Sequence, residues 1–447
     1  NCAAAVTLLL KSDVHCIDAG NQDNEGNTAL HQAIRFAWVE AVEALAPAVA
    51  DGRLDPNVRN SEGTTPLHLL CAMSSGRRRQ CGDRLFAAVL QLGTSKLNFA
   101  VADMKGQTPL HCAASASNSK FLERILGLKD ATVDLTAKNN VGRTAFHCAA
   151  AKGSLHMAEV LLRRAPGAFD VNAADHNGAT ALHVAAADGR RYVVDVLLEH
   201  LDLVDVACTD KKGRNALMWA CSKGHISMAL SILTKAGDHI DLCQASCNGS
   251  TALHLACATA MDRAVKALLE RGADVTALDR HGRPPFFSAL SWTTTAALFF
   301  KHCPPELLAK SDQRQCTPLH HAAALGRATV VEQVLQLVDA GLVDANARDE
   351  SGGTALHCSV RKSAQVWPLL LPRMSEEAIT AQDCRGMTAL HLAVQKADAS
   401  ARLLLPYFTA DARALRSALG KTAIEIAQET CPRMVDLLQG SLTKAAQ

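Results

Sequence analysis

The sequence predicts an all-α solenoid, built from short helices in pairs that stack on one another. Three observations predict this fold. A four-residue motif, as in Thr180-Ala-Leu-His183, recurs along the whole chain. A turn signature of the form Asp-x-x-Gly precedes the motif at a fixed distance. Each motif opens a helix too short to be stable alone, so neighbouring copies must bury each other's apolar faces.

The motif occurs twelve times, with successive copies 33 to 43 residues apart. Nine copies carry histidine at the fourth place, and they begin at Thr28, Thr65, Thr108, Thr144, Thr180, Thr251, Thr317, Thr354 and Thr388. Three degenerate copies begin at Asn215, Pro284 and Thr422. A glycine stands two residues before the motif in eleven copies, and only Gln315 breaks this rule. The regularity predicts repeated structural units.

Each part of the unit has a local physical reason. In the turn, the Asp175 side chain can accept hydrogen bonds from its own turn, and Gly178 supplies a positive φ. Thr180 can cap the N-terminus of a helix over the small residues that follow, and Gly189 can end it. The next segment, RYVVDVLLEHL, has apolar residues at i, i+3, i+4 and i+7, which predicts a second, amphipathic helix.

The motif Asp-x-x-Gly-x-Thr-[Ala/Pro]-Leu-His resembles that of the ankyrin repeat family, and the resemblance covers essentially the whole chain. It implies a curved, elongated solenoid of helix-turn-helix units joined by β-turn or hairpin loops. We expect one continuous domain over residues 1–447. Residues 1–22 would be the second helix of a truncated repeat, and residues 421–447 a C-terminal cap. The repeats would start near residues 23, 60, 103, 139, 175, 210, 246, 279, 312, 349, 383 and 417.

The motif histidines are expected to be part of the scaffold. A catalytic or metal-binding histidine is usually unique, whereas nine occupy one repeat position here. The resemblance implies that they form hydrogen bonds near the turn and the motif threonine.

No catalytic, metal or cofactor site is expected. Some cysteines adjoin a motif histidine, as Cys112 does, but adjacent helical residues point to different sides, so a small core residue is the better interpretation. Cys243 and Cys247 flank a turn without a second pair at zinc-site distance. The chain also has no phosphate loop, dinucleotide fingerprint or nucleophile elbow.

A partner would bind at the positions that the fold leaves free. By the resemblance these are the two residues before the turn glycine, the one after it, and two near the end of the first helix. In the nine repeats from Asp103 to Lys396 they hold only two acidic residues, Asp188 and Glu350. They hold fourteen basic ones: Lys105, Arg143, Lys152, Lys211, Lys212, Arg214, Lys223, Arg280, Arg283, Arg314, Arg361, Lys362, Arg385 and Lys396. The nearby turn aspartates would offset part of this charge, and a merely solvated polar edge is the alternative.

Two further features stand out. The alignment puts Trp292 at a free position near the end of a first helix, beside Arg280 and Arg283, where it would either contact a partner or fill a gap in a degenerate repeat. The insertion SSGRRRQCGD, residues 74–83, carries Arg77–Arg79, which suits either a docking contact or a solvated loop.

The chain has 46 basic and 44 acidic residues, so its net charge of +2 gives no overall field for nucleic acid or membrane. We therefore expect a non-enzymatic adaptor or scaffold, which binds an acidic protein segment or surface through a basic groove on the concave face of the solenoid. An acidic filament surface or tail such as tubulin's would suit it, which suggests a cytoskeletal or other large assembly. The oligomeric state stays open.

Two alternatives remain. The chain begins in mid-repeat without an initiator Met, so it could be the substrate-recruiting part of a larger acyltransferase, kinase or ubiquitin ligase. Nucleic-acid binding is disfavoured by the few aromatic residues. The sixteen cysteines lack any CxxC pair, which favours buried thiols and a cytoplasmic, reducing location, and no apolar run is long enough to span a bilayer.

Overall fold

The computed structural model describes residues 20–73, 79–127, 133–164, 167–360, 362, 364–396, 399–430, 435 and 438. The helix expected before residue 20, Arg77, Arg78, Arg361 and most of the segment after residue 430 lie outside these residues. The described residues form helices and turns and no strand, so the all-α prediction is confirmed. The chain divides into two compact units, Asn1–Asp241 and Leu242–Gln447. The expectation of one continuous domain stays a prediction.

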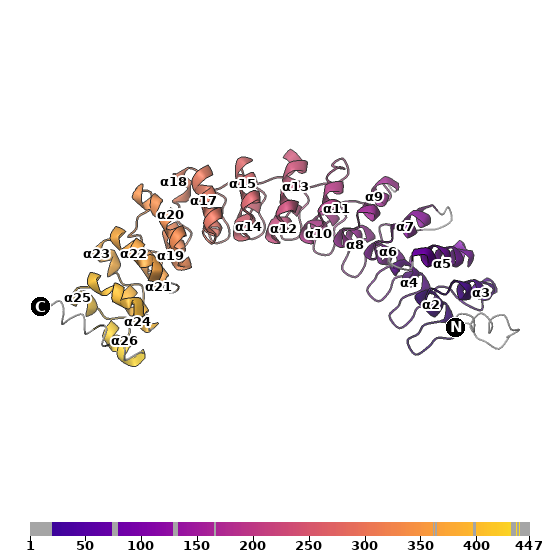
Figure 1. Ribbon diagram of the computed structural model, residues 1–447, viewed down its shortest axis with the longest axis horizontal. Helices are drawn as coiled ribbons and strands as arrows, with labels where there is room; N and C mark the ends of the chain where they lie inside the picture. The colour runs from indigo at the N-terminus through magenta and orange to yellow at the C-terminus, as the bar shows by residue number, and fades with distance from the viewer. Residues whose placement is uncertain are drawn as a thin grey trace. The chain divides into compact units, whose positions relative to one another are not determined.

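In the first unit, each repeat contributes a first helix and a second helix, and each kind of helix packs on its own kind in the next repeat (Figure 1). The first helices are α2 (Ala29–Arg35), α4 (Pro66–Ala72), α6 (Pro109–Ser115), α8 (Ala145–Lys152), α10 (Ala181–Ala187) and α12 (Ala216–Ser222). The second helices are α3 (Val39–Ala50), α5 (Arg79–Gln91), α7 (Ser119–Leu126), α9 (Leu155–Arg164), α11 (Arg191–Leu197) and α13 (Ile226–Ala236). Short 3₁₀ turns follow at Thr94–Lys96 and Gly237–His239.

The second unit follows the same plan. Its first helices are α14 (Ala252–Ala258), α16 (Pro285–Ala289), α19 (Pro318–Leu325), α21 (Ala355–Val360), α24 (Ala389–Gln395) and α26 (Ala423–Thr430). Three regular second helices pair with the first of these: α15 (Asp262–Glu270), α17 (Thr293–His302) and α20 (Ala328–Asp339). Single-turn helices α18 (Pro305–Leu308), α23 (Glu376–Ile379) and α25 (Ala410–Arg413) lie in the connections that follow second-helix segments.

Two repeats of the second unit depart from the predicted pair of continuous helices. The segment after α21 breaks into η3 (Ala364–Val366), α22 (Trp367–Leu370) and η4 (Leu371–Arg373), and the segment after α24 into η5 (Ala399–Leu403) and η6 (Leu405–Tyr407). Pro368, Pro372 and Pro406 lie in these segments. Proline has no backbone N–H and clashes with the preceding turn, so it interrupts an α-helix.

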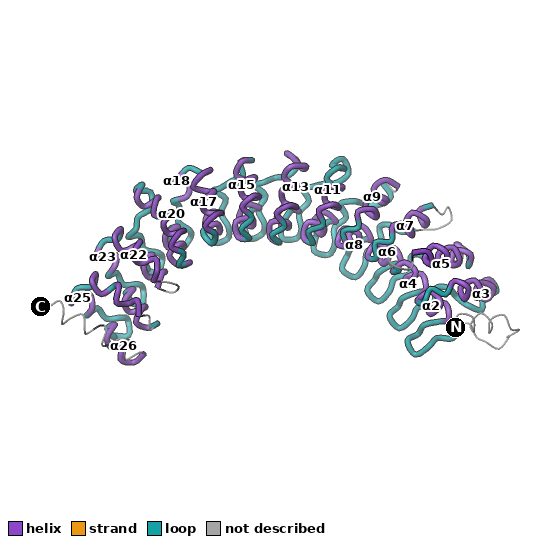
Figure 2. Tube along the Cα trace, in the orientation of Figure 1, coloured by secondary structure: helices purple, strands orange, loops and turns teal. Residues whose placement is uncertain are grey.

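The turns between repeats are joined by a regular backbone ladder. Within each unit, in every turn after the first, the residue after the turn Asp (or the Asn or Ser in its place) donates its N–H to the carbonyl two residues after the corresponding position of the preceding repeat. Lys211 N–H donates to Asn177 O at 2.8 Å in the first unit, and Arg280 N–H donates to Asn248 O at 2.8 Å in the second. Figure 2 shows the turns of the first unit as loops that project from the row of first helices, away from the second helices. The ladder therefore sets the turn tips at regular intervals.

One turn lacks the glycine that its backbone favours. Gln315 has a φ of +59°, where the corresponding residues of the other repeats are glycines. A left-handed conformation costs an ordinary residue about 1–2 kcal/mol. Replacement by glycine removes this cost, but glycine also has more conformational freedom in the unfolded state, which offsets part of the gain in stability. We therefore expect Gln315→Gly to raise the free energy of unfolding by about 0.5–1 kcal/mol, measured by chemical denaturation. Gln313→Gly, two residues upstream and outside the positive-φ residues, is the control and should lower it; a loss of stability in Gln315→Gly contradicts the argument.

Candidate functional site

The motif histidines tie each repeat to the next. In all nine, Nδ1 accepts the backbone N–H of the motif threonine at 3.1–3.2 Å and lies 2.8–3.0 Å from its Oγ1. In eight, Nε2 lies 2.9–3.3 Å from a carbonyl oxygen of the following repeat, such as Arg214 O for His183. Because Nδ1 accepts a hydrogen bond, it carries no proton in the neutral ring. The proton must then lie on Nε2, which donates a hydrogen bond to that carbonyl. We call this arrangement the histidine latch.

In the eight histidines whose Nε2 faces a carbonyl, the latch leaves no free nitrogen for chemistry; only His391 of the nine has an Nε2 without a hydrogen-bond partner among the described residues. His183 is 1% exposed, and burial is the main cause that lowers its pKa below the ordinary value of 6.5. The other eight motif histidines are similarly buried, and their pKa values are lowered for the same reason. The interpretation of the motif histidines as scaffold is thus supported by hydrogen bonds, burial and charge together.

The turn aspartates neutralise four of the predicted contact residues. Arg214 Nη2 lies 2.7 Å from Asp210 Oδ2, and Arg283 Nη2 lies 2.8 Å from Asp279 Oδ2. Arg143 pairs with Asp175 of the next repeat at 3.4 Å, and Arg385 pairs with Asp383 at 3.0 Å. The hydrogen bonds and charges of these arginines help to lower the pKa of Asp210, Asp279 and Asp383, although burial opposes this. Half-buried Arg143, Arg214 and Arg283 thus support their own turns.

Most of the other predicted basic residues point to solvent with their charge uncompensated. Among the residues that the structure describes, eight are exposed and form no ion pair: Lys105, Lys152, Lys211, Lys212, Lys223, Arg280, Arg314 and Lys362. Lys396 is exposed as well. The acidic exceptions Asp188 and Glu350 are also exposed. Arg361 lies outside the described residues.

The densest group lies in the repeat that starts at Asp210. Lys211 and Lys212 occupy the tip of the turn, and Lys223 is the C-cap of α12. Beneath them, Asp210 Oδ2 accepts a hydrogen bond from Trp219 Nε1 at 2.9 Å as well as the ion pair from Arg214. The repeat therefore presents three lysines without ion-pair partners, beside a turn in which Asp210 and Arg214 neutralise each other.

The sequence alone did not mark Trp219 as part of the candidate site. Its half-buried indole ring lies under the Arg214 guanidinium, 4.6 Å from the ring centroid, and contacts His183 of the preceding repeat edge-on. The signal was available, since Trp219 follows the degenerate motif position Met218; the residue at the same place also bonds to the turn Asp in two other repeats, as Gln32 does to Asp23 and His321 to Asp312. Trp219 therefore holds Arg214 and the turn in place.

The position of Trp292 was wrong in the sequence alignment. Trp292 follows α16 and is the N-cap residue of α17, because α16, with 5 residues, is two residues shorter than α12, with 7, in the repeat of Asp210, where His225 is the N-cap of the second helix. Its indole N–H donates to Ala258 O at 3.3 Å, and Arg327 rather than Arg280 lies over its ring, at 5.4 Å. The side chain is 38% exposed. Trp292 thus contacts both the preceding and the following repeat, while part of its side chain stays exposed to solvent.

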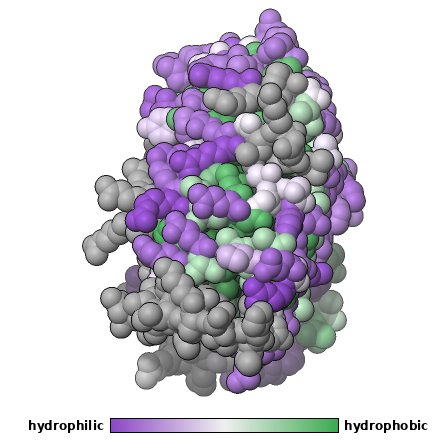
Figure 3. All heavy atoms as spheres, turned by 90° about the vertical axis from the view of Figure 1, so that its right-hand side faces the viewer, coloured by the Kyte–Doolittle hydropathy of each residue, from purple (hydrophilic) through white to green (hydrophobic). Residues whose placement is uncertain are grey.

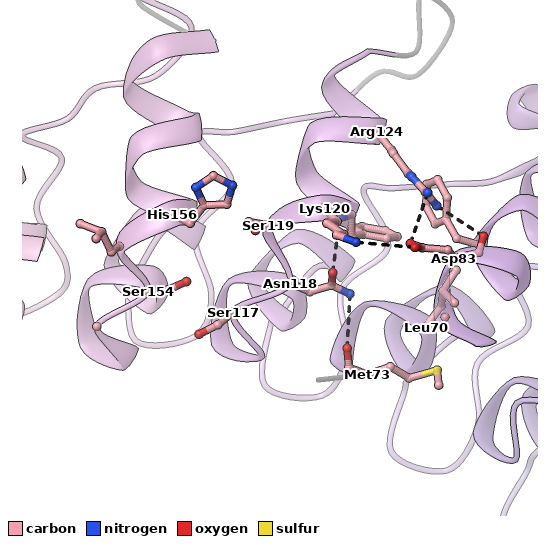
Figure 4. Close-up of a pocket in the computed structure, with 15 residues that line it drawn as sticks. Leu70, Met73, Asp83, Ser117, Asn118, Ser119, Lys120, Arg124, Ser154 and His156 are labelled. Atoms are coloured by element: carbon pink, nitrogen blue, oxygen red, sulfur yellow. Dashed lines mark hydrogen bonds and ion pairs between the residues drawn. The ribbon is translucent and has the colours of Figure 1, made fainter. Parts of the chain in front are cut away.

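The first unit also contains a cavity of about 470 Å³ beside the start of α7 and α9 (Figure 4). Leu70, Phe86 and Phe121 form part of its apolar lining. Asp83 at its rim pairs with Arg124 at 3.2 Å and with Lys120 at 3.6 Å. The charged groups of the rim thus compensate one another, unlike the lysines of the Asp210 repeat.

Seen from the end where α2 and α3 lie, the surface is mainly hydrophilic, with small apolar areas between the polar side chains (Figure 3). The twelve cysteines whose side chains the structure describes form no disulfide with one another. Burial raises the pKa of Cys221 to about 12, so this thiol stays protonated. No described helix has both the length and the apolar character needed to cross a membrane.

Comparison with known proteins gives consistent matches. A family model for ankyrin repeats in three copies matches residues 1–85, 85–175, 118–207 and 201–279, and a single-repeat model matches residues 314–350. The chain is 38% identical to the neurogenic locus notch homolog protein 1 of Xenopus tropicalis over 112 residues, which are 24% of this chain and 4% of that protein. It is 39% identical to the B-cell lymphoma 3 protein homolog of Mus musculus over 83 residues, 18% of each chain.

A putative ankyrin repeat protein of Rickettsia felis is 28% identical over 140 residues, 30% of this chain and 57% of that protein. Each match spans less than two thirds of the relative. Among solved structures, the ankyrin repeat domain of Bcl-3 is 24% identical with a TM-score of 0.42, covering 62% of this chain and all of that domain. The family models cover well over half of the chain, and the turn, motif and latch recur throughout it. The protein therefore belongs to the ankyrin repeat family.

Proposed function

We propose that this protein is a non-enzymatic interaction scaffold, which binds an acidic segment of a protein partner through the exposed lysines of its turn tips and first-helix ends. Ankyrin repeats are in general protein-interaction modules, and their surfaces carry the specificity. The principal contact residues are Lys211, Lys212 and Lys223. The exposed basic residues of other repeats would make the same kind of contact in their own repeats: Lys105 and Lys152 in the same unit, and Arg280, Arg314 and Lys362 in the other.

One observation carries this proposal. In the repeat of Asp210, the turn carboxylate is already neutralised by Arg214 at 2.7 Å, whereas the three lysines around it are exposed and have no ion pair among the described residues. An acidic peptide would supply the missing counter-charges without displacing an internal one. The backbone ladder fixes the turn tip, so binding would order little main chain. A filament surface with acidic tails, such as tubulin's, is one partner of this chemistry.

The proposed location is a reducing compartment such as the cytoplasm. The described cysteines form no disulfide with one another, and many are core residues of helices, as Cys221 and Cys257 are. Proteins of oxidising compartments use cysteines mainly in disulfides. The cysteine pattern therefore supports this part of the proposal.

Charge reversal tests the contact. A fluorescein-labelled oligoglutamate peptide would be titrated with the full chain and with the triple variant Lys211→Glu, Lys212→Glu and Lys223→Glu, and fluorescence anisotropy recorded over a NaCl gradient. Each reversal replaces an attraction by a repulsion, so we expect a loss of about 2 kcal/mol, or roughly thirtyfold in affinity. The affinity of the wild-type chain should fall as salt rises.

The control makes the same charge change elsewhere. Arg163, Arg263 and Lys301 are exposed on the second helices α9, α15 and α17, and their replacement by glutamate should leave the affinity unchanged. Equal losses in both triple variants would reduce the binding to net charge and reject the site. Tighter binding of single-stranded DNA than of the peptide, lost in the same lysine variant, would favour a nucleic-acid partner instead.

A further inference from the structure

In three repeats, the same three positions meet at the first helix: the turn residue, the fourth residue after it and the ninth. In the repeat of Asp210 these are Asp210, Arg214 and Trp219, joined at 2.7 and 2.9 Å. In the first repeat, Gln32 Nε2 donates to Asp23 Oδ2 at 2.7 Å and Asn27 Nδ2 lies 3.4 Å from the same oxygen. In both repeats, the carboxylate faces hydrogen-bond donors that cannot bind a metal.

The same three positions hold a different set of groups in the repeat of Asp312. They are Asp312, Cys316 and His321, and one potential ligand atom from each lies within 4.8 Å of the other two. Asp312 Oδ1 accepts the backbone N–H groups of Arg314 and Cys316, both at 2.9 Å. The other oxygen, Oδ2, faces His321 Nε2 at 3.0 Å. The turn thus fixes the carboxylate and leaves one oxygen directed at the thiol and imidazole.

The chemistry of this set is that of a zinc site. Zn²⁺ takes thiolate, imidazole and carboxylate ligands, and a site with three protein ligands keeps a fourth position for water. Among the described residues this is the one cluster of at least three such groups. Its members are partly exposed, and His321 also lines a hollow of about 320 Å³, which gives water and ions a route to the cluster. Arg283 lines the same hollow, but Asp279 at 2.8 Å offsets its charge.

We propose that Asp312, Cys316 and His321 bind a Zn²⁺ ion, with water as the fourth ligand. The spacing Asp-x₃-Cys-x₄-His is not a recognised zinc motif, so sequence analysis expected no metal. The turn must fold back over the helix before the three groups converge. The ion would bind the turn of this repeat to its first helix, in the place where arginine does so in the repeat of Asp210.

Cobalt is a spectroscopic probe for this site. The full chain would be stripped with EDTA under reducing conditions and titrated with Co²⁺, while thiolate-to-cobalt charge transfer and the visible d–d bands are recorded. We expect one Co²⁺ per chain at this site, displaced by Zn²⁺. Cys316→Ser should remove the charge-transfer band, and His321→Asn should weaken binding at least about tenfold. Zn²⁺ should also raise the Tm of the wild type but of neither variant.

Exposed thiols elsewhere provide the matched control. Cys243, Cys247 and Cys384 are exposed, and their joint replacement by serine should leave the band and the affinity intact. The site is refuted by a wild-type chain without the band, by a band that persists in Cys316→Ser, or by a band lost in the control. Circular dichroism of the metal-free variants checks the fold; if Cys316→Ser does not fold, the loss of affinity in His321→Asn decides the question.

Discussion

Acidification is expected to lower the free energy of unfolding steeply as the pH falls from neutral through about 6.5, the ordinary pKa of histidine. The nine latch histidines have pKa values lowered by burial below the ordinary 6.5, so the folded protein keeps them neutral. The unfolded chain protonates them near pH 6.5. Between 6.5 and each lowered pKa, the unfolded state therefore binds more protons than the folded state, and stability falls as the pH falls.

The size of the effect follows from linkage. Each histidine that takes up its proton only on unfolding adds about 1.4 kcal/mol per pH unit, so three in one cooperative transition give a slope of about 4 kcal/mol per unit. The stabilisation is complete above the unfolded pKa and is lost downward through this window. The lowered pKa values of Asp23, Asp210, Asp279 and Asp383 act in the same direction, but below their ordinary value of 3.8.

Urea denaturation followed by circular dichroism at several pH values measures this slope. The double variant His147→Gln and His183→Gln should reduce it by up to about two protons, whatever its own stability. Replacing the exposed His176, His239 and His302 by glutamine should leave it unchanged. A flat stability between pH 8 and about pH 5 would show that the latch tolerates protonation, and the assignment of its hydrogen bonds would then be wrong.

Gly178→Ala is expected to cost about 3 kcal/mol of stability. Gly178 has a φ of +79°, and an added Cβ would lie 2.8 Å from the backbone nitrogen of Lys211 in the next turn. That nitrogen donates the ladder hydrogen bond to Asn177 O, so the two turns cannot separate without breaking it. The change thus combines a left-handed alanine with a clash against main chain.

Gly224→Ala separates the two contributions. Gly224 has a φ of +74°, but no atom lies within 4 Å of the Cβ it would gain. It should therefore cost only about 1 kcal/mol, for the strained backbone. Chemical denaturation of both variants gives the difference, and equal losses would mean that the turns yield to the clash.

The features that were predicted correctly from the sequence depend on residues that lie close together in the chain. The pairing of Thr180 with His183, three residues apart, and the turn from Asp175 to Gly178 depend on short-range geometry, which the repeated motif reveals. The basic positions of the candidate surface could also be read from the repeat register. Their exposure, as at Lys211, follows because the register defines which side of the unit faces solvent.

What sequence reasoning missed depends on contacts between repeats or on a change of register. The acceptor of His183 is a carbonyl 31 residues further along the chain, and the ion pair of Arg143 with Asp175 joins adjacent repeats. The position of Trp292 differs from the alignment because a two-residue shortening of one first helix is invisible in an alignment anchored on the motif. The cluster of Asp312 with its thiol and imidazole needs the folded turn before its spacing has meaning.

The latch also makes the first unit directional, because each of its five motif histidines donates toward the following repeat and none toward the preceding one. Removing a repeat from the C-terminal side of a unit would leave the last imidazole N–H without its acceptor. Removing one from the N-terminal side leaves every remaining imidazole satisfied. Within the first unit, fraying should therefore start more readily at the C-terminal side, and a shortened first unit should keep its later repeats rather than its earlier ones.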